Sequence, residues 1–256
     1  VVKNVDHVAA LLRDPEAIAK ARAFPYQLMV AAQNVADGMP REIVDALHDA
    51  MEIASANVPK VQGQVVICPD VSGSMTWAVT GYRPGATSAV RHVDVAGLVA
   101  ASFLRSARGV QVLPFDYEVR NVRLEPRDTI LTNAEKLAAL GGGGTNCSAP
   151  LAYLNKRGRA PDLVVFVSDN QSWVDARAGG QGTAMMKEWE VIKRRNPKAK
   201  LVCIDIAPYG TTQAQTRKDV LNIGGFSDAV FSQIAAFAND ETGPEHWVGE
   251  IAKIEL

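Results

Sequence analysis

Cysteine is scarce in this sequence, and its few positions exclude the disulfide and zinc frameworks on which many small domains depend. The 256 residues contain three cysteines, Cys68, Cys147 and Cys203, which are far apart and form no CxxC pair. An odd number of widely spaced thiols predicts reduced cysteines and therefore a cytoplasmic protein. A chain of this length buries roughly 70–75% of the surface that its unfolded form exposes, so it needs neither device to fold.

Long apolar runs and an excess of one charge are also missing. No window approaches about 18 uninterrupted apolar residues, and no basic stretch with an apolar run after it opens the chain, so we expect neither a membrane span nor a signal peptide. The chain carries 27 Lys+Arg and 28 Asp+Glu, a net charge of −1. This balance argues against a protein that holds nucleic acid mainly by bulk electrostatics. The four histidines are scattered and form no HExxH or similar motif.

Residues 1–60 are predicted to form a short all-helical segment. Pro15, Pro25 and Pro40 each stand where a new helix could begin, and Ile43 and Leu47 open a longer helical pattern that ends near residues 57–59. No strand-like alternation precedes residue 64. We therefore expect roughly four short helices here and a second domain that spans residues 61–256.

From residue 64 onward, short apolar runs alternate with helical patterns. The runs are continuous, which is typical of strands that are covered on both faces of a parallel sheet. The repeated β–α order predicts an α/β fold with a doubly wound, mostly parallel, Rossmann-like sheet. The expected strands are 65–68, 110–115, 163–167 and 201–206, and the expected helices are 93–107, 133–140, 148–155 and 185–196. Residues 119–124 are predicted as an antiparallel edge strand, and 229–231 as a last strand before a helix at 234–238.

Polar residues follow the first and third of these strands, at the edge where parallel sheets bind ligands. Asp70, Ser72 and Ser74 follow the first strand, Asp169 follows the third, and Thr145 stands between them after four consecutive glycines. These two carboxylates and three hydroxyls form an oxygen-only set that suits Mg²⁺, with Mn²⁺ or Ca²⁺ as alternatives. Two carboxylates about 5 Å apart repel by roughly 3 kcal/mol at an effective dielectric constant of ~20, and a divalent cation would reverse that penalty.

A structural role and two catalytic roles are the alternatives for the same residues. Asp70 and the two serines could merely cap a turn and the helix after it. Ser72 lies in no GxSxG elbow and has no histidine at a telling position, so it is not predicted to be a nucleophile. A phosphatase that used Asp70 as nucleophile would need a second aspartate where Ser72 stands. The glycine run at 141–144 lacks the lysine of a phosphate-binding loop, and it is expected to leave the loop that carries Thr145 mobile.

The motif Asp70-Val71-Ser72-Gly73-Ser74, with Thr145 and Asp169 in that order, resembles the metal-ion-dependent adhesion site (MIDAS) of a von Willebrand factor A domain. Segments 72–75, 85–90 and 168–173 are similar to the A domain of the Ro/TROVE family, especially of its bacterial members. Residues 1–60 resemble the last helices of that family's ring of HEAT-like repeats. The resemblance covers nearly the whole chain, while most of the ring would be missing.

The resemblance implies a noncatalytic, Mg²⁺-binding domain of a ribonucleoprotein. In that family the helical ring binds small noncoding Y RNAs and the ends of misfolded RNAs, and bacterial relatives are associated with exoribonucleases in RNA processing and decay. It also implies that the metal accepts an acidic group from a protein partner. The alternative is an A domain of an unrelated adhesion or metal-chelatase system with no RNA role, against which the helical segment and the long loop at 76–88 argue.

A few residues beside the expected site are further candidates for ligand binding. Trp77, Tyr82 and Arg83 occupy the loop at 76–88, and Asn170 follows the second carboxylate. Aromatic residues and arginine dominate binding hot spots. The alternative for these residues, and for Trp173, is packing against their own domain.

Two basic clusters allow either an RNA contact or a structural role. Lys193, Arg194 and Arg195 stand near the end of a predicted helix, where cations complement the helix dipole. The second hypothesis for this cluster is contact with RNA phosphates, and residues 156–159 allow the same two interpretations. Residues 1–60 have a net charge of −2 and the remainder +1, so neither part is an electrostatic RNA clamp.

Overall fold

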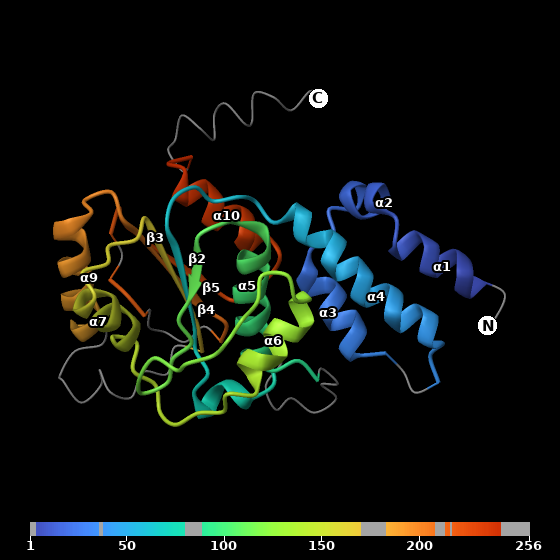
Figure 1. Cartoon of the computed structure of the whole chain (residues 1–256), viewed down its shortest axis with the longest axis horizontal. Helices are drawn as coiled ribbons and strands as arrows, with labels where there is room; N and C mark the ends of the chain where they lie inside the picture. Colours follow the sequence, from blue (N-terminus) through green and yellow to red (C-terminus); the bar gives the residue numbers. More distant parts are fainter. Residues whose placement is uncertain are drawn as a thin grey trace.

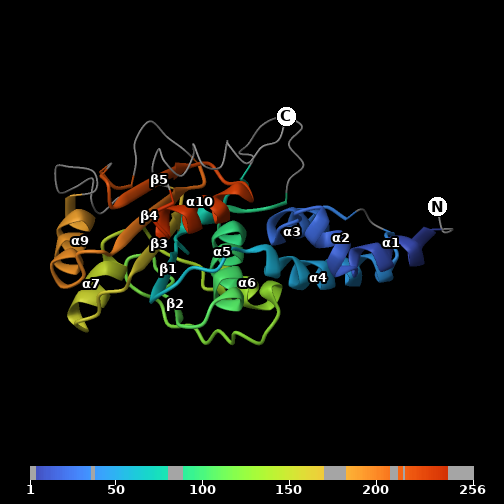
Figure 2. The same cartoon turned by 90° about the horizontal axis from the view of Figure 1, so that it is seen from above.

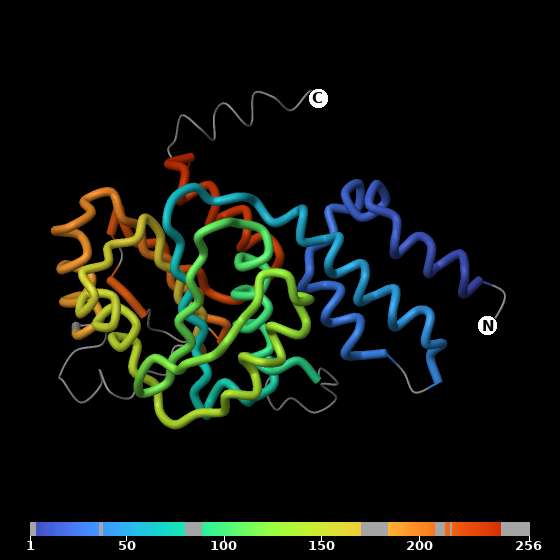
Figure 3. The backbone as a smooth tube through the Cα atoms, viewed as in Figure 1, coloured from blue at the N-terminus to red at the C-terminus, as the bar shows by residue number. Residues whose placement is uncertain are grey.

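The computed structural model describes residues 4–35, 38–79, 89–169, 183–207, 213–215 and 217–241. It shows a parallel sheet with helices on both faces and, at one end of the molecule, a separate group of helices formed by the N-terminal residues (Figures 1 and 2). The chain passes from that group into the sheet through residues 58–64 (Figure 3).

Within the described ranges the sheet has five strands, all parallel, in the order β2-β1-β3-β4-β5. Their register places Val65 of β1 opposite Val110 of β2 on one side and Leu163 of β3 on the other. Every residue of β1 and β3 is buried, which explains their continuous apolar sequences. The strands are β1 Val65–Pro69, β2 Val110–Val112, β3 Leu163–Ser168, β4 Lys200–Asp205 and β5 Val220–Gly224.

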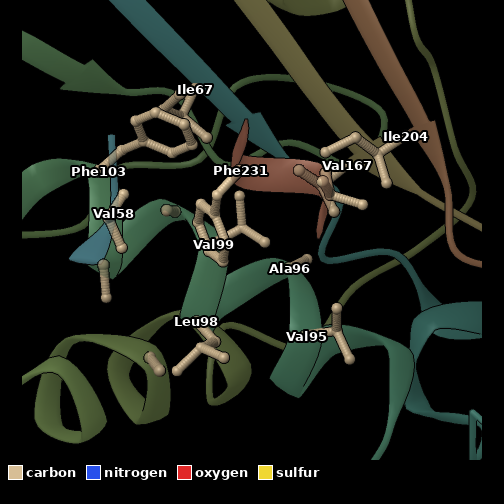
Figure 4. Packing of buried hydrophobic residues seen from close by; sticks show 14 of the residues in the cluster. Val58, Ile67, Val95, Ala96, Leu98, Val99, Phe103, Val167, Ile204 and Phe231 are labelled. Carbon is tan, nitrogen blue, oxygen red and sulfur yellow. The ribbon is translucent and has the colours of Figure 1, made fainter. Parts of the chain in front are cut away.

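Helices cover the two faces of the sheet and form two apolar cores. On one face, α5 (His92–Ser106) and α10 (Ala229–Ala238) pack on the sheet and α6 (Ile130–Ala138) packs on α5. Figure 4 shows this core, in which Val99 and Phe231 lie among Ile67, Val167 and Ile204 of the strands. On the other face, α7 (Ala149–Lys156) and α9 (Thr183–Arg195) cover the alternate side chains of the same strands. The predicted doubly wound α/β fold is therefore confirmed.

The predicted all-helical character of the segment before the sheet is also confirmed. Its helices are α1 Val5–Leu12, α2 Pro15–Lys20, α3 Pro25–Gln33 and α4 Arg41–Ala54, followed by the short helix η2 Ser55–Asn57. Pro15 and Pro25 occupy the first turns of their helices, where a missing N–H costs nothing. Two ring contacts join the segment to the region of α10: Phe24 stacks on Phe231 at 5.8 Å, and Tyr26 meets Phe226 edge-on at 4.9 Å between ring centroids.

The predicted antiparallel edge strand at residues 119–124 is wrong. A single antiparallel bridge joins Val119 to Phe115, and no ladder follows it. The chain instead turns back on itself, because the backbone N–H of Arg120 donates to the Pro114 carbonyl at 2.7 Å and the Arg120 guanidinium pairs with Asp116 at 2.6 Å.

The predicted strand at residues 229–231 is wrong as well, because these residues form the first turn of α10. The buried residues Val230, Ile234 and Phe237 repeat at helical spacing along the whole segment. The last strand among the described residues is β5, which the sequence pattern did not reveal because it lies at the sheet edge, is only partly buried and contains Asn222. No helix among the described residues is long and apolar enough to cross a membrane.

Candidate metal centre

The winding of the sheet places a topological switch point at the carboxyl ends of β1 and β3. After β1 the chain crosses one face through α5 to reach β2, and it later reaches β3, on the other side of β1, after passing through α7 on the opposite face. The strand order therefore reverses between β1 and β3, where open α/β sheets bind ligands. Asp70 directly follows β1 and Asp169 directly follows β3, so the topology brings both predicted carboxylates to this point.

Asp70 is completely buried, and both of its carboxylate oxygens accept hydrogen bonds. The backbone N–H of Ser72 donates to Oδ1 at 2.8 Å, and the hydroxyl of Ser168 donates to Oδ2 at 2.6 Å. Burial, with a smaller contribution from the charge of Asp169, raises the pKa of Asp70 to about 7 against the opposing effect of the hydrogen bonds from Ser168 and Ser72. A buried carboxylate in this state gains stability from any cation that binds beside it.

The three predicted hydroxyls form a connected chain next to this carboxylate. Thr145 Oγ1 donates to Ser72 Oγ at 2.8 Å, and Ser72 Oγ lies 3.4 Å from Ser74 Oγ. Ser72 and Thr145 are 1% exposed, whereas Ser74 is half-buried at the start of the short helix η3 (Gly73–Thr76). The structure therefore brings Asp70, Ser72, Ser74 and Thr145 together in one group.

Asp169 completes the set of predicted ligands and is 1% exposed. Burial is the main cause of the raised pKa of Asp70 and of Asp205, and the negative charge of Asp169 adds to it in both cases, so the carboxylates lie within electrostatic reach of one another. The Asp169 charge also acts on His92 at the start of α5, whose pKa is lowered overall because burial outweighs the effect of this charge. The site therefore concentrates negative charge at the carboxyl edge of the sheet.

The glycine run that carries Thr145 is held in place, contrary to the expected mobile loop. The backbone N–H of Gly73 donates to the Gly143 carbonyl at 2.9 Å, and that of Gly143 donates to Asp116 at 3.2 Å. A Cβ atom on Gly142 would overlap the carbonyl oxygen of Val71 and lie 3.1 Å from the Ser72 Cα. The glycines thus allow the loop to lie directly against the Asp70–Ser74 turn.

The donor set fits a hard divalent cation. It contains oxygen atoms alone, two from carboxylates that are buried and the rest from hydroxyls, which is the ligand chemistry of Mg²⁺ and, with longer bonds, of Ca²⁺. Within the described part of the chain, no lysine or arginine pairs with Asp70, and no cluster of three or more His, Cys, Asp or Glu side chains could hold a metal ion. A cation here would therefore depend on the hydroxyls as much as on the carboxylates.

Several residues around the site were not predicted from the sequence. Ser168 holds Asp70, Asp116 anchors the glycine loop, and Asp205 ends β4 next to Asp169. Gln213 donates to Asp205 and, at 3.1 Å, to the Ile204 carbonyl. The signal that could have found Ser168 and Asp205 is their position, since each is a polar residue at the carboxyl end of an apolar strand.

Only part of the predicted ligand-binding group lies within the described residues. Trp77 directly follows η3 and its side chain is 49% exposed, so it borders the site at the surface. Tyr82, Arg83, Asn170 and Trp173 lie outside the described residues. Their part in ligand binding stays a prediction.

The three basic residues at the end of α9 lie in different environments: Lys193 is largely buried, and the two arginines are exposed. The ammonium of Lys193 donates to the backbone carbonyls of Pro197 and Ala199, lies 3.7 Å from Asp219 and is 17% exposed. Arg194 and Arg195 are exposed, and Arg195 reaches Asn155 at the end of α7. These contacts favour the helix-end role for Lys193 and leave the two arginines at the surface.

The fold and this arrangement of oxygen ligands define an α/β domain of the von Willebrand factor A type. A family model described as the Ro60 vWA domain matches residues 64–238. The chain belongs to the Ro60 vWA domain family.

Two named relatives and one solved structure extend the similarity into the helical segment. The chain is 28% identical over 251 residues to the RNA-binding protein RO60 of Deinococcus radiodurans, a match that covers 93% of this chain and 45% of that protein. It is 23% identical over 249 residues to the RNA-binding protein RO60 of Caenorhabditis elegans, which covers 89% of this chain and 36% of that protein. The crystal structure of the Deinococcus radiodurans RO (RSR) protein superposes with a TM-score of 0.75 at 23% identity, over 94% of this chain and 49% of that one. The chain thus spans half or less of the length of these relatives.

Proposed function

We propose that this chain supplies a noncatalytic divalent-cation site that accepts an acidic group of a partner, within a Ro-type protein that binds RNA. The observation that supports the cation site is the burial of Asp70. Its carboxylate is fully buried and pairs with no lysine or arginine among the described residues. Three hydroxyls are connected beside it through the Thr145–Ser72 hydrogen bond. Burying an ionised carboxylate is costly unless another charge compensates it.

The residues that would hold the cation are Asp70, Ser72, Ser74, Thr145 and Asp169. When bound, Mg²⁺, or Mn²⁺ or Ca²⁺ in its place, supplies a compensating positive charge and keeps coordination positions open for a carboxylate of a protein partner. Ser74 is the one hydroxyl of the group that is not fully buried, so the partner approaches from its side of the site. Exposed Trp77 directly follows the same short helix and offers apolar surface to that partner.

A noncatalytic role is supported by the surroundings of Ser72. Its hydroxyl lies next to those of Thr145 and Ser74 and, within the described residues, makes no hydrogen bond to a histidine or lysine that could activate it. His92, the nearest histidine in the sequence, has no hydrogen-bond partner for Nδ1 in the described structure. The hydroxyls are therefore placed as neutral ligands.

The RNA part of the proposal is supported by the family and by the two relatives that are named RNA-binding proteins. We assign noncoding RNA of the Y RNA class as the partner of the intact protein, bound mainly by helical repeats upstream of this chain, with an exoribonuclease as a further partner in RNA processing. The three cysteines are buried and form no disulfide, which agrees with a cytoplasmic location. Family membership argues against the adhesion and metal-chelatase alternative.

Calorimetric titration of the chain with Mg²⁺ tests the metal assignment. Asp70→Ala removes one of the two carboxylates, so we expect Mg²⁺ binding to fall below detection while circular dichroism shows an intact fold. Asp45→Ala serves as the control, because it removes an exposed carboxylate of α4 far from the sheet edge. Unchanged Mg²⁺ affinity in Asp70→Ala would overturn the assignment. The RNA part is tested separately on the intact protein by sequencing the RNA that cross-links to it in cells.

A further inference from the structure

A groove on the far end of the domain is not explained by the metal centre. It has a volume of about 490 Å³ and lies between the turn at residues 117–119 and one face of α7. The residues of α7 that line it are spaced three or four apart, as expected for a single helix face. Figures 1 and 2 place α7 and α9 at the end of the molecule opposite the N-terminal helices. The lining side chains that matter for the argument are Tyr117, Glu118, Asn146, Tyr153, Lys156 and Arg157.

Two flat surfaces line this groove. The guanidinium carbon of Arg157 lies over the Tyr153 ring, 3.6 Å from its centre, so the half-buried ring holds the exposed guanidinium against the helix surface. Tyr117 is 59% exposed, and its ring lies over the backbone of Gly143 and Gly144, which fixes its position. Both surfaces are therefore preorganised for stacking rather than free to rotate.

The charge at the groove favours an anionic ligand. Lys156 and Arg157 are exposed at the end of α7, and Arg195 donates to Asn155 Oδ1 at 3.1 Å, which brings the basic end of α9 beside them. Among the described residues that line the groove, Glu118 is the one acidic side chain, and it pairs with Arg120 at 3.6 Å. Phosphates that enter the groove would therefore meet two cations that no carboxylate of the described lining neutralises.

We propose that this groove, named here the α7 groove, binds single-stranded RNA. One base stacks on the Arg157–Tyr153 pair and another on Tyr117, while Lys156 and Arg157 contact the phosphates. An acidic peptide would use the same charges but would gain nothing from the two flat surfaces, so the geometry favours RNA. The inference rests on the proposed RNA partnership of the protein but not on its metal site.

Fluorescence anisotropy with a labelled oligoadenylate of about 12 nucleotides, titrated with this chain at low salt, tests the proposal. Tyr153→Ala is expected to weaken binding by at least about fivefold, because a stacked base is lost. Arg157→Lys is expected to weaken it almost as much as Arg157→Ala, since lysine keeps the charge but has no planar group. Lys156→Ala should lower the slope of log affinity against log salt by about 0.7, the value for one phosphate contact on a single strand.

Control variants separate stacking from general charge. Tyr153→Phe keeps the ring and is expected to bind like the unaltered chain. The double variant Lys20→Ala/Arg41→Ala removes two exposed positive charges from the helical segment and should change affinity by less than twofold.

The proposal is overturned if the chain does not bind the oligoadenylate, if Arg157→Lys binds normally, or if the helical-segment control loses as much as the groove variants. Polyglutamate that competes as well as RNA would assign the groove to an acidic peptide instead. The groove variants are expected to bind Mg²⁺ with unchanged affinity, so a failure of the groove proposal is distinguishable from a failure of the metal assignment. If RNA is recovered with the intact protein but does not bind this chain, RNA binding at the α7 groove is overturned while the RNA partnership of the intact protein stands.

Discussion

At the residue scale, the proposed metal centre depends on how a single buried carboxylate is oriented. Asp70 receives one hydrogen bond from its own turn and one from Ser168, which lies on the neighbouring strand. The second bond matters more for geometry, because it ties the carboxylate that follows β1 to the neighbouring strand β3. Residues that orient metal ligands in this way contribute strongly to metal affinity although they never touch the ion.

We therefore predict that Ser168→Ala weakens Mg²⁺ binding by about tenfold, the lower end of the effect seen when such supporting residues are removed. The free energy of unfolding should fall by about 1–2 kcal/mol, because a buried hydrogen bond to a charged group is lost. Calorimetry with Mg²⁺ and urea unfolding in EDTA measure the two effects separately.

Ser102 offers a matched control for this substitution. It is also a completely buried serine, on α5, but its hydroxyl has no hydrogen-bond partner in the described structure. Ser102→Ala should leave Mg²⁺ affinity unchanged and be neutral or slightly stabilising. If both alanine variants bound Mg²⁺ alike, the orienting role of Ser168 would be refuted.

The candidate ligands could be predicted from the sequence, whereas the residues that support them could not. Asp70, Ser72 and Ser74 are recognisable because the motif is local, and Thr145 and Asp169 because they stand beside glycines and at a strand end. Ser168 and Asp116 act through contacts 98 and 27 residues away in the chain. Such contacts depend on which strands become neighbours, and no local pattern contains that information.

At the element scale, the glycine loop and the Asp70–Ser74 turn behave as one packed unit. The glycine run by itself indicated a mobile loop, because composition shows the freedom of the chain but not the space around it. In the folded protein that space is filled by the Val71–Ser72 backbone and by the Tyr117 ring. The same limitation explains the wrong strand at 229–231: a short apolar run fits a strand or a helix, and the spacing of the residues after it decides.

We predict that Gly142→Ala displaces this loop. The added methyl group would overlap the Val71 carbonyl oxygen and crowd Ser72, neither of which can move without shifting β1. We expect a loss of about 1–3 kcal/mol in the free energy of unfolding, the usual cost of forcing a group into packed structure. Mg²⁺ affinity should fall at least tenfold because Thr145 moves away from Ser72. Urea unfolding and calorimetry provide the two measurements.

Gly141→Asn provides the comparison within the same loop. Gly141 has a φ of +48°, which asparagine tolerates, and a Cβ atom there would meet no atom within 4 Å. This variant should retain Mg²⁺ binding and most of the stability. Equal losses in the two variants would mean that flexibility of the run, rather than close packing at Gly142, is what the site requires.

At the scale of the whole molecule, the helical segment and the A domain meet at a junction that contains a buried acidic group. Asp228 precedes α10 and is 8% exposed, and its Oδ1 has no hydrogen-bond partner in the described structure. Burial raises its pKa to about 6, which the backbone N–H of Tyr26 opposes. The pKa of the Tyr26 hydroxyl is raised by burial and, in addition, by the charge of Asp228. Tyr26 belongs to α3, so this carboxylate lies where the helical segment contacts the domain.

A carboxylate with a raised pKa makes the junction less stable as pH increases. Between about pH 4 and pH 6 the unfolded chain releases this proton while the folded chain retains it, so the free energy of unfolding falls across that interval and is then constant. Asp228→Asn removes the effect. The variant should match the unaltered protein near pH 4 and be more stable by about 1–2 kcal/mol above pH 6, a value reduced from the full shift because the site is partly solvated.

Asp219→Asn should show the opposite sign, which makes it the control for this prediction. Hydrogen bonds from Trp189 and Arg217 hold the pKa of Asp219 below its usual value. Its contribution to stability is present above the unfolded pKa and is lost as pH falls, so the asparagine variant should be least stable relative to the unaltered protein at neutral pH. Urea unfolding in EDTA at half-unit steps from pH 2 to pH 8 measures both curves, because the Asp219 contribution is lost below about pH 4. A stability difference for Asp228→Asn that did not change with pH would show that the charge at the junction carries no penalty.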